Sequence, residues 1–324
     1  AATVLTAAYR TARQLFQFLK PRASAASIGQ KLRQKYQSAG RWAVVTGGSD
    51  GIGRELAIQL AVAGGFHVCV VARTQSKLDE VVAEIHSRAP NVHAQAIAFD
   101  FSTTDLSLYA DLTSKLDALE GGVGILVNNV GMSHASGELF ESPSIAEDIK
   151  LLHVNCVPSL VLAKHFIPVW KEHKKGGLMI NLSSLSAVVR AVPYLSTYAA
   201  TKAFNRVFSN SLTYELGPFG IDVMTVTPGF VSTSMTKGTS SHKPRTSFQM
   251  VDAVEMAHDV LQTVAFSSKS TTETAGHRNH AIFQAFLETF YSTATMGKKA
   301  YTIMKKRSDF RKAKEEAKAV ETQQ

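Results

Sequence analysis

Tyr198 and Lys202 stand four residues apart in the segment YAATK, and their side chains are the first candidates for chemistry in this sequence. On a helix, side chains four residues apart share one face, so the lysine ammonium can lie near the phenol. At about 4 Å and an effective dielectric of about 20, the ammonium favours the phenolate by roughly 4 kcal/mol before desolvation is subtracted. The spacing therefore predicts a tyrosine whose pKa falls from about 10 toward working pH, as a general acid requires.

Hydroxyl side chains precede this pair, at the end of the apolar run LMINL. Ser183 and Ser184 follow the run directly, and Ser186 stands two residues further on. A hydroxyl at a strand end can hold a substrate carbonyl oxygen close to an acid that protonates it. The combination indicates acid-assisted chemistry at a carbonyl group.

A glycine-rich stretch, TGGSDGIG (46–53), follows the apolar run WAVVT and opens a helical pattern. Glycines let the backbone turn sharply and approach a pyrophosphate closely. The helix that follows presents free amide hydrogens and a positive dipole end to the phosphates. Its position after the first strand of an alternating α/β pattern predicts a dinucleotide site.

The end of the second apolar run indicates which dinucleotide is used. A fold selective for NAD usually places an Asp or Glu there, to accept a hydrogen bond from the adenosine ribose. This sequence has no acid there and carries Arg73 instead. A guanidinium can bind a 2′-phosphate that a carboxylate would repel, so we expect NADPH/NADP⁺ as the cofactor.

These residues lie far apart in the sequence and need a scaffold that gathers them. Continuous apolar strands separated by helices are typical of a parallel sheet covered on both faces. Right-handed crossovers then give a doubly wound α/β (Rossmann) fold with ligands at the carboxyl ends of its strands. The expected strands are 42–46, 66–72, 92–99, 124–128, 178–182 and 221–227, and the expected helices are 51–64, 75–88, 104–119, 143–173 and 197–217. Beyond Ser234 we expect a loop at 236–249, a helix at 250–266, a last strand at 277–283 and a helical extension after it.

The chain of 324 residues has a net charge of +9, and this charge is concentrated at its two ends. Residues 1–49 hold eight basic residues and no acid, and residues 298–324 hold nine basic and four acidic residues. A nucleic-acid-binding domain carries its positive charge on the folded surface, so we expect no nucleic-acid partner. The pattern predicts a basic N-terminal segment and linker (1–40), a catalytic NADP-binding domain (41–283) and a helical basic extension (284–324).

The segment 3–20 places apolar residues at helical spacing, contains no acid, and ends at Pro21. Such a helix can lie in a membrane interface, resemble an organelle transit peptide or pack on a partner subunit. Basic ends that only aid solubility are the remaining alternative. No stretch approaches 18 consecutive apolar residues, so the sequence gives no obvious membrane span.

Smaller features complete the survey. Cys69 and Cys156 are too few for a disulfide framework and are expected to be buried thiols. His277 and His280 have possible metal-ligand spacing, but no nearby acid or cysteine joins them, so we expect no metal. An apolar stripe after them suits core packing or a wall for a long acyl chain: Ile282, Phe283, Phe286, Leu287, Phe290 and Tyr291.

Taken together, the motifs resemble those of the short-chain dehydrogenase/reductase family. The matching pieces run in the family's order from Trp42 to about Met235, about 60% of the chain: TGGSDGIG (46–53), NNVG (128–131), Asn155 in HVNC, LSS (182–184), YAATK (198–202) and PGFVST (228–233). The family usually places its catalytic serine thirteen residues before the tyrosine, where this chain has Leu185. We expect Ser184 to take that role, with Ser186 as the alternative.

The resemblance implies a role for each matching residue. Tyr198 would protonate the carbonyl oxygen as hydride arrives, and Lys202 would lower the pKa of Tyr198 and bind the nicotinamide ribose. Ser184 would bind the substrate oxygen, and Asn155 would anchor a water that connects Lys202 to solvent. The implied cofactor contacts are Gly47, Ser49, Asp50, Gly51, Ile52 and Gly53 at the pyrophosphate turn, Arg73, Asp100 and Asn128 on the adenosine side, and Pro228, Gly229 and Thr233 over the nicotinamide.

Finer features resemble the branch of very-long-chain 3-oxoacyl-CoA reductases and 17β-hydroxysteroid dehydrogenases: WAVVTGGSDGIG, VARTQSKL, GILVNNVGMSH and the basic extension. This resemblance implies NADPH-dependent reduction of a lipophilic ketone, most simply a long-chain 3-oxoacyl-CoA, with a steroid 17-ketone or 3-ketosphinganine as alternatives. It also implies membrane association at the endoplasmic reticulum; the acid-free N-terminus leaves the mitochondrion as the other compartment. A homo-oligomer through 143–173 and 197–217 is expected. A catalytically silent accessory subunit docked to a larger complex is the competing hypothesis.

Overall fold

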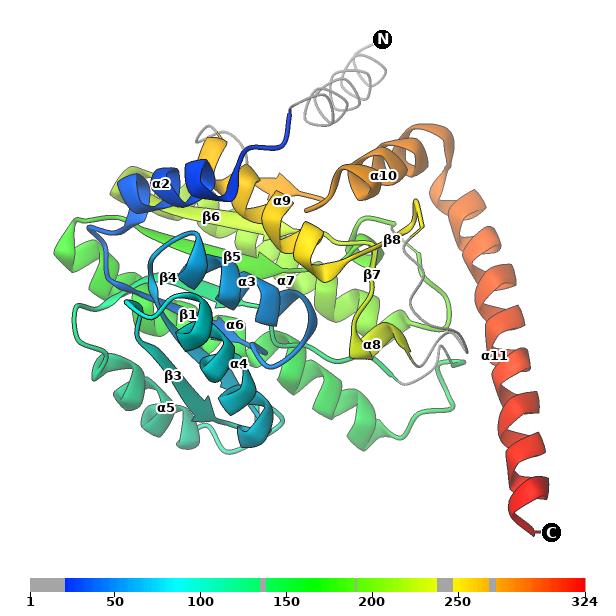
Figure 1. Cartoon of the computed structure of the whole chain (residues 1–324). Coiled ribbons are helices and arrows are strands. Elements are labelled where there is room, and N and C mark those ends of the chain that lie inside the picture. The colour runs from blue at the N-terminus through cyan, green and yellow to red at the C-terminus, as the bar shows by residue number, and fades with distance from the viewer. Residues whose placement is uncertain (1–20, 135–137, 190, 238–246, 268–271, 324) are drawn as a thin grey trace.

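The computed structural model describes residues 21–134, 138–189, 191–237, 247–267 and 272–323. Its centre is a seven-stranded parallel sheet in the order β3-β2-β1-β4-β5-β6-β9 (Figure 1). The strands are β1 (Trp42–Thr46), β2 (His67–Ala72), β3 (Ala94–Ala98), β4 (Val123–Asn128), β5 (Gly177–Leu182), β6 (Ile221–Val226) and β9 (Glu273–Thr274). The chain reverses its direction across the sheet between β3 and β4, so the doubly wound Rossmann fold expected from the alternating pattern is confirmed.

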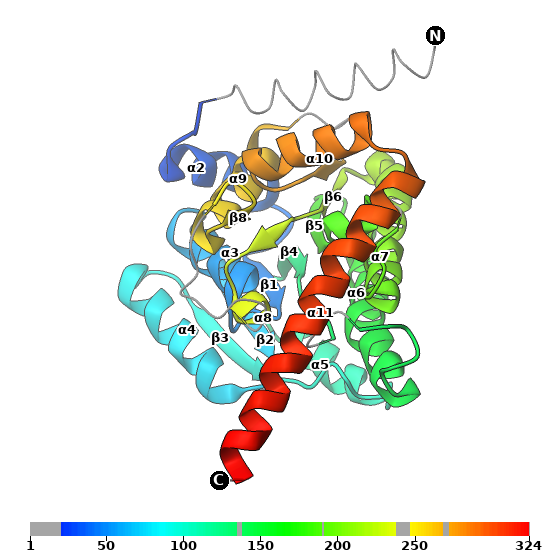
Figure 2. The ribbon, with the colours of Figure 1, turned by 90° about the vertical axis from the view of Figure 1, so that its right-hand side faces the viewer.

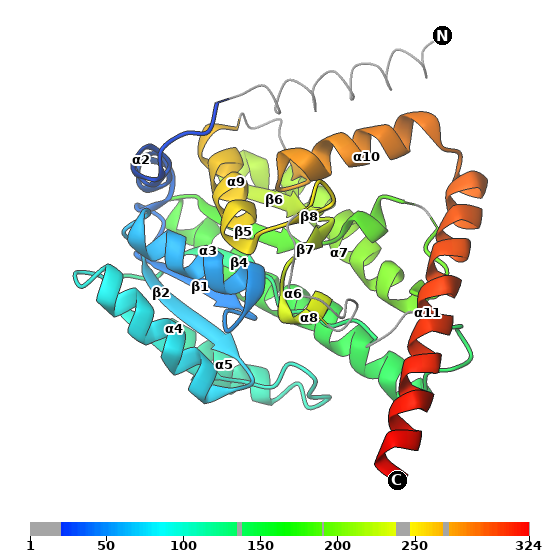
Figure 3. The same cartoon turned by 45° about the vertical axis from the view of Figure 1, so that its right-hand side comes forward.

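Helices cover both faces of the sheet (Figure 3). One layer holds α3 (Gly51–Val62), α4 (Gln75–Arg88) and α9 (Ala253–Phe266), and the other holds α5 (Leu108–Asp117), α6 (Ile145–His173) and α7 (Ser196–Leu216). Alternate residues of each strand point into opposite layers; Val45 packs with the first and Val44 with the second. Because both faces are buried, β1, β4 and β5 are buried along their whole length.

Within the described part of the chain, α6 is the one helix long and apolar enough to cross a membrane. Its buried side chains, including Leu162, Phe166 and Trp170, pack against the sheet, and the Trp170 indole donates to the Val123 carbonyl at 2.6 Å. Length and composition alone do not separate a spanning helix from the core helix of a domain. We therefore describe α6 as part of the core.

The segment before β1 is a packed helix, so the expectation of a linker there was wrong. Helix α2 (Ala25–Tyr36) buries Ile28, Leu32 and Tyr36, which follow one another at helical spacing of four residues. Because the segment is mostly polar, this narrow apolar stripe does not stand out in its sequence. The N-terminal segment 3–20 lies outside the described residues.

Basic residues that the charge pattern assigned to a free N-terminus bind the domain instead. The Arg33 guanidinium donates to the carbonyls of Ala63 and Gly64, which follow α3, and the Lys35 ammonium donates to the Val264 carbonyl in the last turn of α9. Cations are favoured at helix C-termini, where the carbonyls have no partner within the helix. These charges therefore stabilise the fold and are not available to a partner.

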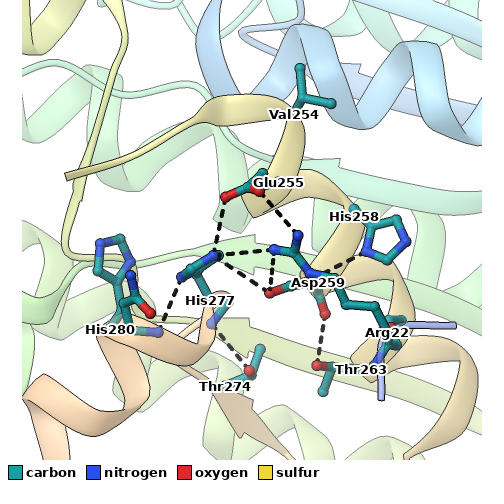
Figure 4. A network of polar contacts seen from close by, with 12 residues as sticks. Arg22, Val254, Glu255, His258, Asp259, Thr263, Thr274, His277 and His280 are labelled. Atoms are coloured by element: carbon teal, nitrogen blue, oxygen red, sulfur yellow. Dashed lines mark hydrogen bonds and ion pairs between the residues drawn. The ribbon is translucent and has the colours of Figure 1, made fainter. Parts of the chain in front are cut away.

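A polar network ties the start of the described chain to its C-terminal part (Figure 4). The Arg22 guanidinium binds Glu255 at 3.0 Å and Asp259 at 3.2 Å, both on α9. His277 lies beside the same carboxylates, at 3.5 Å from Glu255, and caps the next helix by accepting from the Asn279 amide. The network joins three segments that are distant in sequence.

Replacing Leu32 by Ala tests whether α2 belongs to the domain. Leu32 is fully buried, so its removal leaves a cavity and is expected to lower the free energy of unfolding by about 2–4 kcal/mol. Urea unfolding of the whole chain measures the change, with the exposed Gln30→Ala on the same helix as the matched control. An unchanged midpoint for Leu32→Ala would mean that α2 does not pack in solution.

The C-terminal region departs from expectation at the last strand. Residues 278–290 form helix α10 (Arg278–Phe290), so the expected strand at 277–283 was wrong; the last strand is the two-residue β9 that precedes it. The buried residues of α10 fall at helical spacing: His280, Ala281, Gln284 and Ala285. The expected boundary between 283 and 284 therefore falls inside a helix.

A long helix, α11 (Thr293–Gln323), confirms the expected helical extension and runs along the outside of the domain (Figures 1 and 2). Helix α8 (Ser234–Lys237) and the paired strands β7 (Phe230–Val231) and β8 (Met250–Val251) lie between β6 and α9. Of the loop expected at 236–249, residues 238–246 lie outside the described residues.

Candidate active site

Ser184 and Tyr198 meet where β5 ends and α7 begins. The Ser184 hydroxyl lies within interaction range of the Tyr198 phenol and lowers its pKa. It also accepts from the Ser186 amide at 3.1 Å, which caps a short 3₁₀ helix at Leu185–Ala187. The one extra residue between serine and tyrosine is thus taken up in this turn, and the hydroxyl still reaches the phenol.

The neighbouring serines have other surroundings. The Ser183 hydroxyl donates to the Lys202 carbonyl at 2.6 Å and so fixes α7 against the end of β5. The Ser186 hydroxyl is buried and has no hydrogen-bond partner among the described residues. Of the three hydroxyls, that of Ser184 is the one that influences the pKa of the phenol, and this supports Ser184 over Ser186 as the substrate-binding serine.

Lys202 is almost completely buried, with 4% of its surface exposed. Its ammonium donates to the Leu182 carbonyl at 3.1 Å and lies 6.0 Å from the centre of the Tyr198 ring. Burial lowers the pKa of Lys202 to about 8. The ammonium has further hydrogen atoms to donate, as binding of a ribose would require.

The expected fall in the pKa of Tyr198 was wrong for the protein without cofactor. Burial raises the pKa of the phenol, and the Ser184 hydroxyl lowers it by less. Tyr198 therefore keeps its proton at neutral pH. A protonated phenol is the form that can donate a proton to a developing alkoxide.

Asn155, in the middle of α6, holds the chain that leaves β4. Its side-chain oxygen accepts from the Met132 amide at 2.7 Å, and its nitrogen donates to the Met132 carbonyl and the Thr201 hydroxyl, each at 2.9 Å. A Cβ atom at Gly131 would lie 3.0 Å from the Lys202 ammonium and 3.3 Å from the Asn155 oxygen. Asn155 thus lies beside Lys202, while its role in anchoring a water stays a prediction.

A row of buried polar side chains behind these residues was not predicted from the sequence. Asn128, at the end of β4, donates to the Asn181 side-chain oxygen at 2.8 Å, and Asn181 donates to the Ser209 hydroxyl at 2.7 Å. Asn205 then donates to the Asn155 carbonyl at 2.8 Å. The row joins β4 and β5 to α6 and α7, while the Asn128 side-chain oxygen has no hydrogen-bond partner among the described residues. It leaves Asn128 buried inside the sheet.

The glycine-rich turn has the tight geometry that its composition predicts. Gly47 and Gly51 adopt φ angles of 64° and 56°, which other residues rarely adopt. A Cβ atom at Gly53 would lie 2.2 Å from the Asn129 side chain and 2.5 Å from the Gly47 carbonyl. The turn therefore requires glycine, and it opens α3 at the carboxyl end of β1, where a phosphate fits.

Asn129 and Thr46 fix this turn, although neither was predicted as a site residue. The Asn129 side chain donates to the carbonyls of Thr46 and Gly47, each at 3.0 Å, and the Thr46 hydroxyl accepts from the Asn129 amide at 3.0 Å. They join the ends of β1 and β4. Nothing in the spacing of the NNVG motif distinguishes Asn129 from Asn128, so only the structure separates their roles.

The other turn residues have defined positions. The Asp50 carboxylate caps α3 by accepting from the Gly51 amide at 2.7 Å, Ser49 is half-buried, and Ile52 packs on the core. One amide at the helix start is therefore already bonded to the chain's own carboxylate. Asp50 is exposed, so a bound phosphate would face this carboxylate or displace it.

Arg73 and Asp100 stand at the carboxyl ends of β2 and β3, at the adenosine side of the glycine turn. Both are exposed. A hydrogen bond from the Ser102 amide holds the pKa of Asp100 below its ordinary value, and the charge of Arg73 contributes to this. The Arg73 guanidinium has no hydrogen-bond or ion-pair partner among the described residues, so its donors are open to a ligand.

The segment after β6 closes the site from the other side. A Cβ atom at Gly51 would lie 2.6 Å from the Thr233 methyl group, and the Pro228 carbonyl accepts from the Leu185 amide at 2.8 Å. The Gly229 amide donates to Nδ1 of His280 at 3.2 Å, while Nε2 of His280 faces the Phe230 carbonyl at 3.1 Å. The structure thus brings 228–233 between the glycine turn and the serine loop.

The surroundings of His280 and of the two cysteines suit structural roles. Burial lowers the pKa of His280 to about 4, so the ring is neutral and can accept from Gly229. Cys69 is buried and Cys156 half-buried, and burial raises their thiol pKa values to about 12 and about 11. These thiols are therefore poor nucleophiles at neutral pH.

The arrangement as a whole fits a dinucleotide and a carbonyl substrate. The glycine turn brings the N-terminus of α3 to the carboxyl end of β1, Arg73 offers an open guanidinium, and Lys202 keeps unused donors beside a protonated Tyr198. All of these groups lie at the carboxyl ends of parallel strands, where ligands bind in open α/β sheets.

Comparison with known proteins agrees with this geometry. Residues 41–244 match the family model described as short chain dehydrogenase. A very-long-chain 3-oxoacyl-CoA reductase of Neurospora crassa is 36% identical over 298 residues, which cover 90% of this chain and 86% of the relative. A putative steroid dehydrogenase 2 of Caenorhabditis elegans is 32% identical, over 87% and 84% of the two chains. Among solved structures, a short-chain dehydrogenase from Sphingobium yanoikuyae in complex with NADPH superimposes with a TM-score of 0.62 at 26% identity, covering 72% of this chain and 87% of the other.

Proposed function

From the premise that this chain belongs to the short-chain dehydrogenase/reductase family and is an oxidoreductase, we propose that it uses NADPH to reduce the ketone of a long-chain 3-oxoacyl-CoA. The observation that carries the proposal is the placement of the Ser184 hydroxyl and the buried Lys202 ammonium beside a protonated Tyr198. An acid with its proton in place is what reduction of a ketone requires.

In this proposal each side chain acts on the carbonyl oxygen or on the cofactor. Ser184 and Tyr198 donate hydrogen bonds to the ketone oxygen, and Tyr198 transfers its proton as negative charge develops there. The Lys202 ammonium stabilises the negative charge that the phenolate bears after the proton has left. Its free N–H donors hold the nicotinamide ribose. Bound NADPH supplies the hydride. Pro228, Gly229 and Thr233 exclude water from the reacting carbon.

The glycine turn holds the cofactor in this scheme. Backbone amides of Ser49, Ile52 and Gly53 would approach the pyrophosphate, with Asp50 capping the helix beside it. Gly47 and Gly51 shape the turn, since their amides donate to the Val71 carbonyl and the Asp50 carboxylate. Arg73 would bind the 2′-phosphate, and Asp100 the adenosine side. Asn128 is buried inside the sheet, so its contribution is to position the neighbouring Asn129 and Asn181.

Arg73→Ala is expected to weaken NADPH binding by about 10- to 150-fold, because a hydrogen bond to a charged group contributes about 1.5–3 kcal/mol. NADH has no 2′-phosphate, so its dissociation constant is expected to change less than about twofold. Titration calorimetry with each dinucleotide measures both values. Arg88→Ala, an exposed arginine on α4 that pairs with Glu84, is the matched control. Equal loss of affinity for both dinucleotides would refute selection by Arg73.

The substrate is tested with a panel. The purified whole chain is given NADPH with a long-chain 3-oxoacyl-CoA, a steroid 17-ketone or 3-ketosphinganine, and loss of NADPH absorbance is followed. The proposal expects kcat/KM to be highest for the acyl-CoA. The name of the worm relative supports the steroid as the second candidate. A higher kcat/KM for the steroid would reassign the substrate and leave the reaction class unchanged.

The accessory-subunit hypothesis depended on the displaced serine and on the unusual basic termini. Since Ser184 still lies beside Tyr198, the argument from the serine is weakened. The panel tests it too: bound NADPH with no turnover of any ketone would favour that hypothesis over the reductase.

A homo-oligomer and a membrane partner complete the proposal. Apolar side chains are exposed on α6 and α7, among them Ile145 at 77%, Val207 at 65% and Tyr214 at 79%, and such a face suits a second copy of the chain. The Neurospora relative's name supports a lipid substrate, and we infer membrane association at the endoplasmic reticulum from it. The mitochondrial alternative rests on the acid-free N-terminus alone.

A further inference from the structure

The outer surface of α10 and α11 exposes several aromatic and apolar side chains. On α10, Phe286 is 45% and Phe290 71% exposed, and their rings lie 5.2 Å apart. The Tyr291 ring lies 5.7 Å from Phe286, and the Lys299 ammonium lies 4.3 Å above the Tyr291 ring. A contiguous aromatic cluster of this kind on a surface marks an interaction site more often than single exposed residues do.

The cluster continues along one side of α11. Lys299, Ile303, Lys306 and Phe310 follow one another at spacings of four, three and four residues, which places them on one stripe of the helix. Ile303 is 53% and Phe310 69% exposed, and both lysines are exposed. The stripe therefore alternates a cation with an apolar side chain and points away from the domain.

The opposite side of α11 faces the candidate active site. A Cβ atom at Gly297 would lie 3.4 Å from Ala191, and the Tyr301 ring lies 5.6 Å from the Tyr194 ring. Ala191 and Tyr194 belong to the loop between Ser184 and Tyr198. Figure 2 shows α11 crossing in front of the ends of the strands. The inner side of α11 thus packs on this loop. The outer stripe stays exposed and can contact a partner.

Charge identifies the kind of partner. The segment 298–324 has a net charge of +5. The chain contains no acidic residue between positions 290 and 308. Lysines can extend toward lipid phosphates while phenylalanine and isoleucine enter the boundary of the acyl chains. A protein surface would be expected to meet such a stripe with paired acids, whereas an anionic bilayer accepts cations and apolar side chains together.

We propose that the outer face of α10 and α11, formed by Phe286, Phe290, Tyr291, Lys299, Ile303, Lys306 and Phe310, docks on an anionic lipid surface. This deepens the membrane partner of the proposed function and assigns it to described residues. Docking on this face places α11 on the bilayer and keeps the loop between Ser184 and Tyr198 one helix diameter, about 10 Å, from the surface in which a long-chain substrate dissolves.

Vesicle co-sedimentation of the full chain tests the docking face. Phosphatidylcholine vesicles with phosphatidylserine are compared with phosphatidylcholine alone, without any substrate. The triple variant Phe290→Ser/Ile303→Ser/Phe310→Ser is expected to lose at least tenfold in partition onto the anionic vesicles. The variant Lys299→Glu/Lys306→Glu is expected to lose the preference for phosphatidylserine, because cations near an anionic surface act through screened attraction.

The matched control replaces apolar residues elsewhere: Val62→Ser/Leu106→Ser/Val254→Ser, which are 39%, 59% and 51% exposed. It should partition like the parent, and thermal melting should show that every variant is folded. The proposal is overturned if the triple variant binds the anionic vesicles within twofold of the parent. It is also overturned if binding is lost only in the variant Arg10→Glu/Arg13→Glu. A changed oligomeric state with unchanged vesicle binding also overturns it, in favour of a second copy. Since no turnover is measured, failure of the proposed reaction leaves this test intact.

Discussion

Replacing Tyr198 by Phe is expected to lower kcat for ketone reduction by about 10²- to 10⁴-fold, the range that a positioned general acid contributes. The phenylalanine ring fills the same space, so the fold and the NADPH dissociation constant should stay within about twofold of the parent. Only the proton and the interaction with Ser184 are lost. Single-turnover measurement of NADPH oxidation at saturating substrate isolates the chemical step.

The neighbouring serines provide the internal comparison for this experiment. Ser184→Ala removes the hydroxyl beside the phenol and should slow the same step, whereas Ser186→Ala removes a buried hydroxyl that has no partner in the described part of the chain and should leave it nearly unchanged. A Tyr198→Phe chain that keeps a third or more of the parent rate would show that another group donates the proton.

Replacing Lys202 by Met is expected to lower turnover while raising the free energy of unfolding of the cofactor-free chain. Lys202 is a buried cation with a single hydrogen bond among the described residues, to the Leu182 carbonyl, and burial lowers its pKa to about 8. Removing a poorly compensated buried charge while keeping the volume should stabilise the cofactor-free fold by about 1 kcal/mol, or about 2–4 °C in melting temperature. The same change should reduce turnover by at least about 10²-fold, because charge stabilisation beside the phenolate is lost.

The pH dependence of the folding stability follows from the lowered pKa of Lys202. In the unfolded chain the lysine keeps its proton to about pH 10.4, whereas in the cofactor-free folded chain it loses the proton near pH 8. Between these values the unfolded state binds more protons, so the lysine's cost to stability decreases as pH rises through this window. The parent should therefore gain stability relative to Lys202→Met between about pH 8 and 10. Urea midpoints across this range measure the difference, and a constant difference would contradict the lowered pKa.

The sheet and the glycine-rich turn could be predicted from sequence because their signals are local. The runs WAVVT and LMINL are apolar throughout, as strands buried on both faces must be, and TGGSDGIG can turn only with its glycines in place. Helix α2 was missed because only Ile28, Leu32 and Tyr36 carry its pattern, within a polar segment. The strand expected at 277–283 was wrong because a two-residue strand is too short to leave a pattern, and because the buried residues of 278–290, among them His280, Ala281 and Gln284, fall at helical spacing.

Within the site, spacing could place Tyr198 beside Lys202 but could not determine the pKa of the phenol. That pKa depends on how deeply the ring is buried, which is a property of α7, the serine loop and β5 together. Likewise, the bonds of Asn129 to Thr46 and Gly47 join two strands that are distant in sequence. Such contacts require the register of β1 against β4, and no local pattern contains it.

The contact between Gly229 and His280 constrains how this protein can vary. A Cβ atom at position 229 would lie 2.8 Å from the His280 ring, and the ring accepts the Gly229 amide hydrogen. A side chain at 229 is therefore tolerated only with a smaller residue at 280, which in turn leaves the amide without its acceptor. The two positions should covary among relatives, and a mutational library that changes them one at a time would misjudge both as immutable.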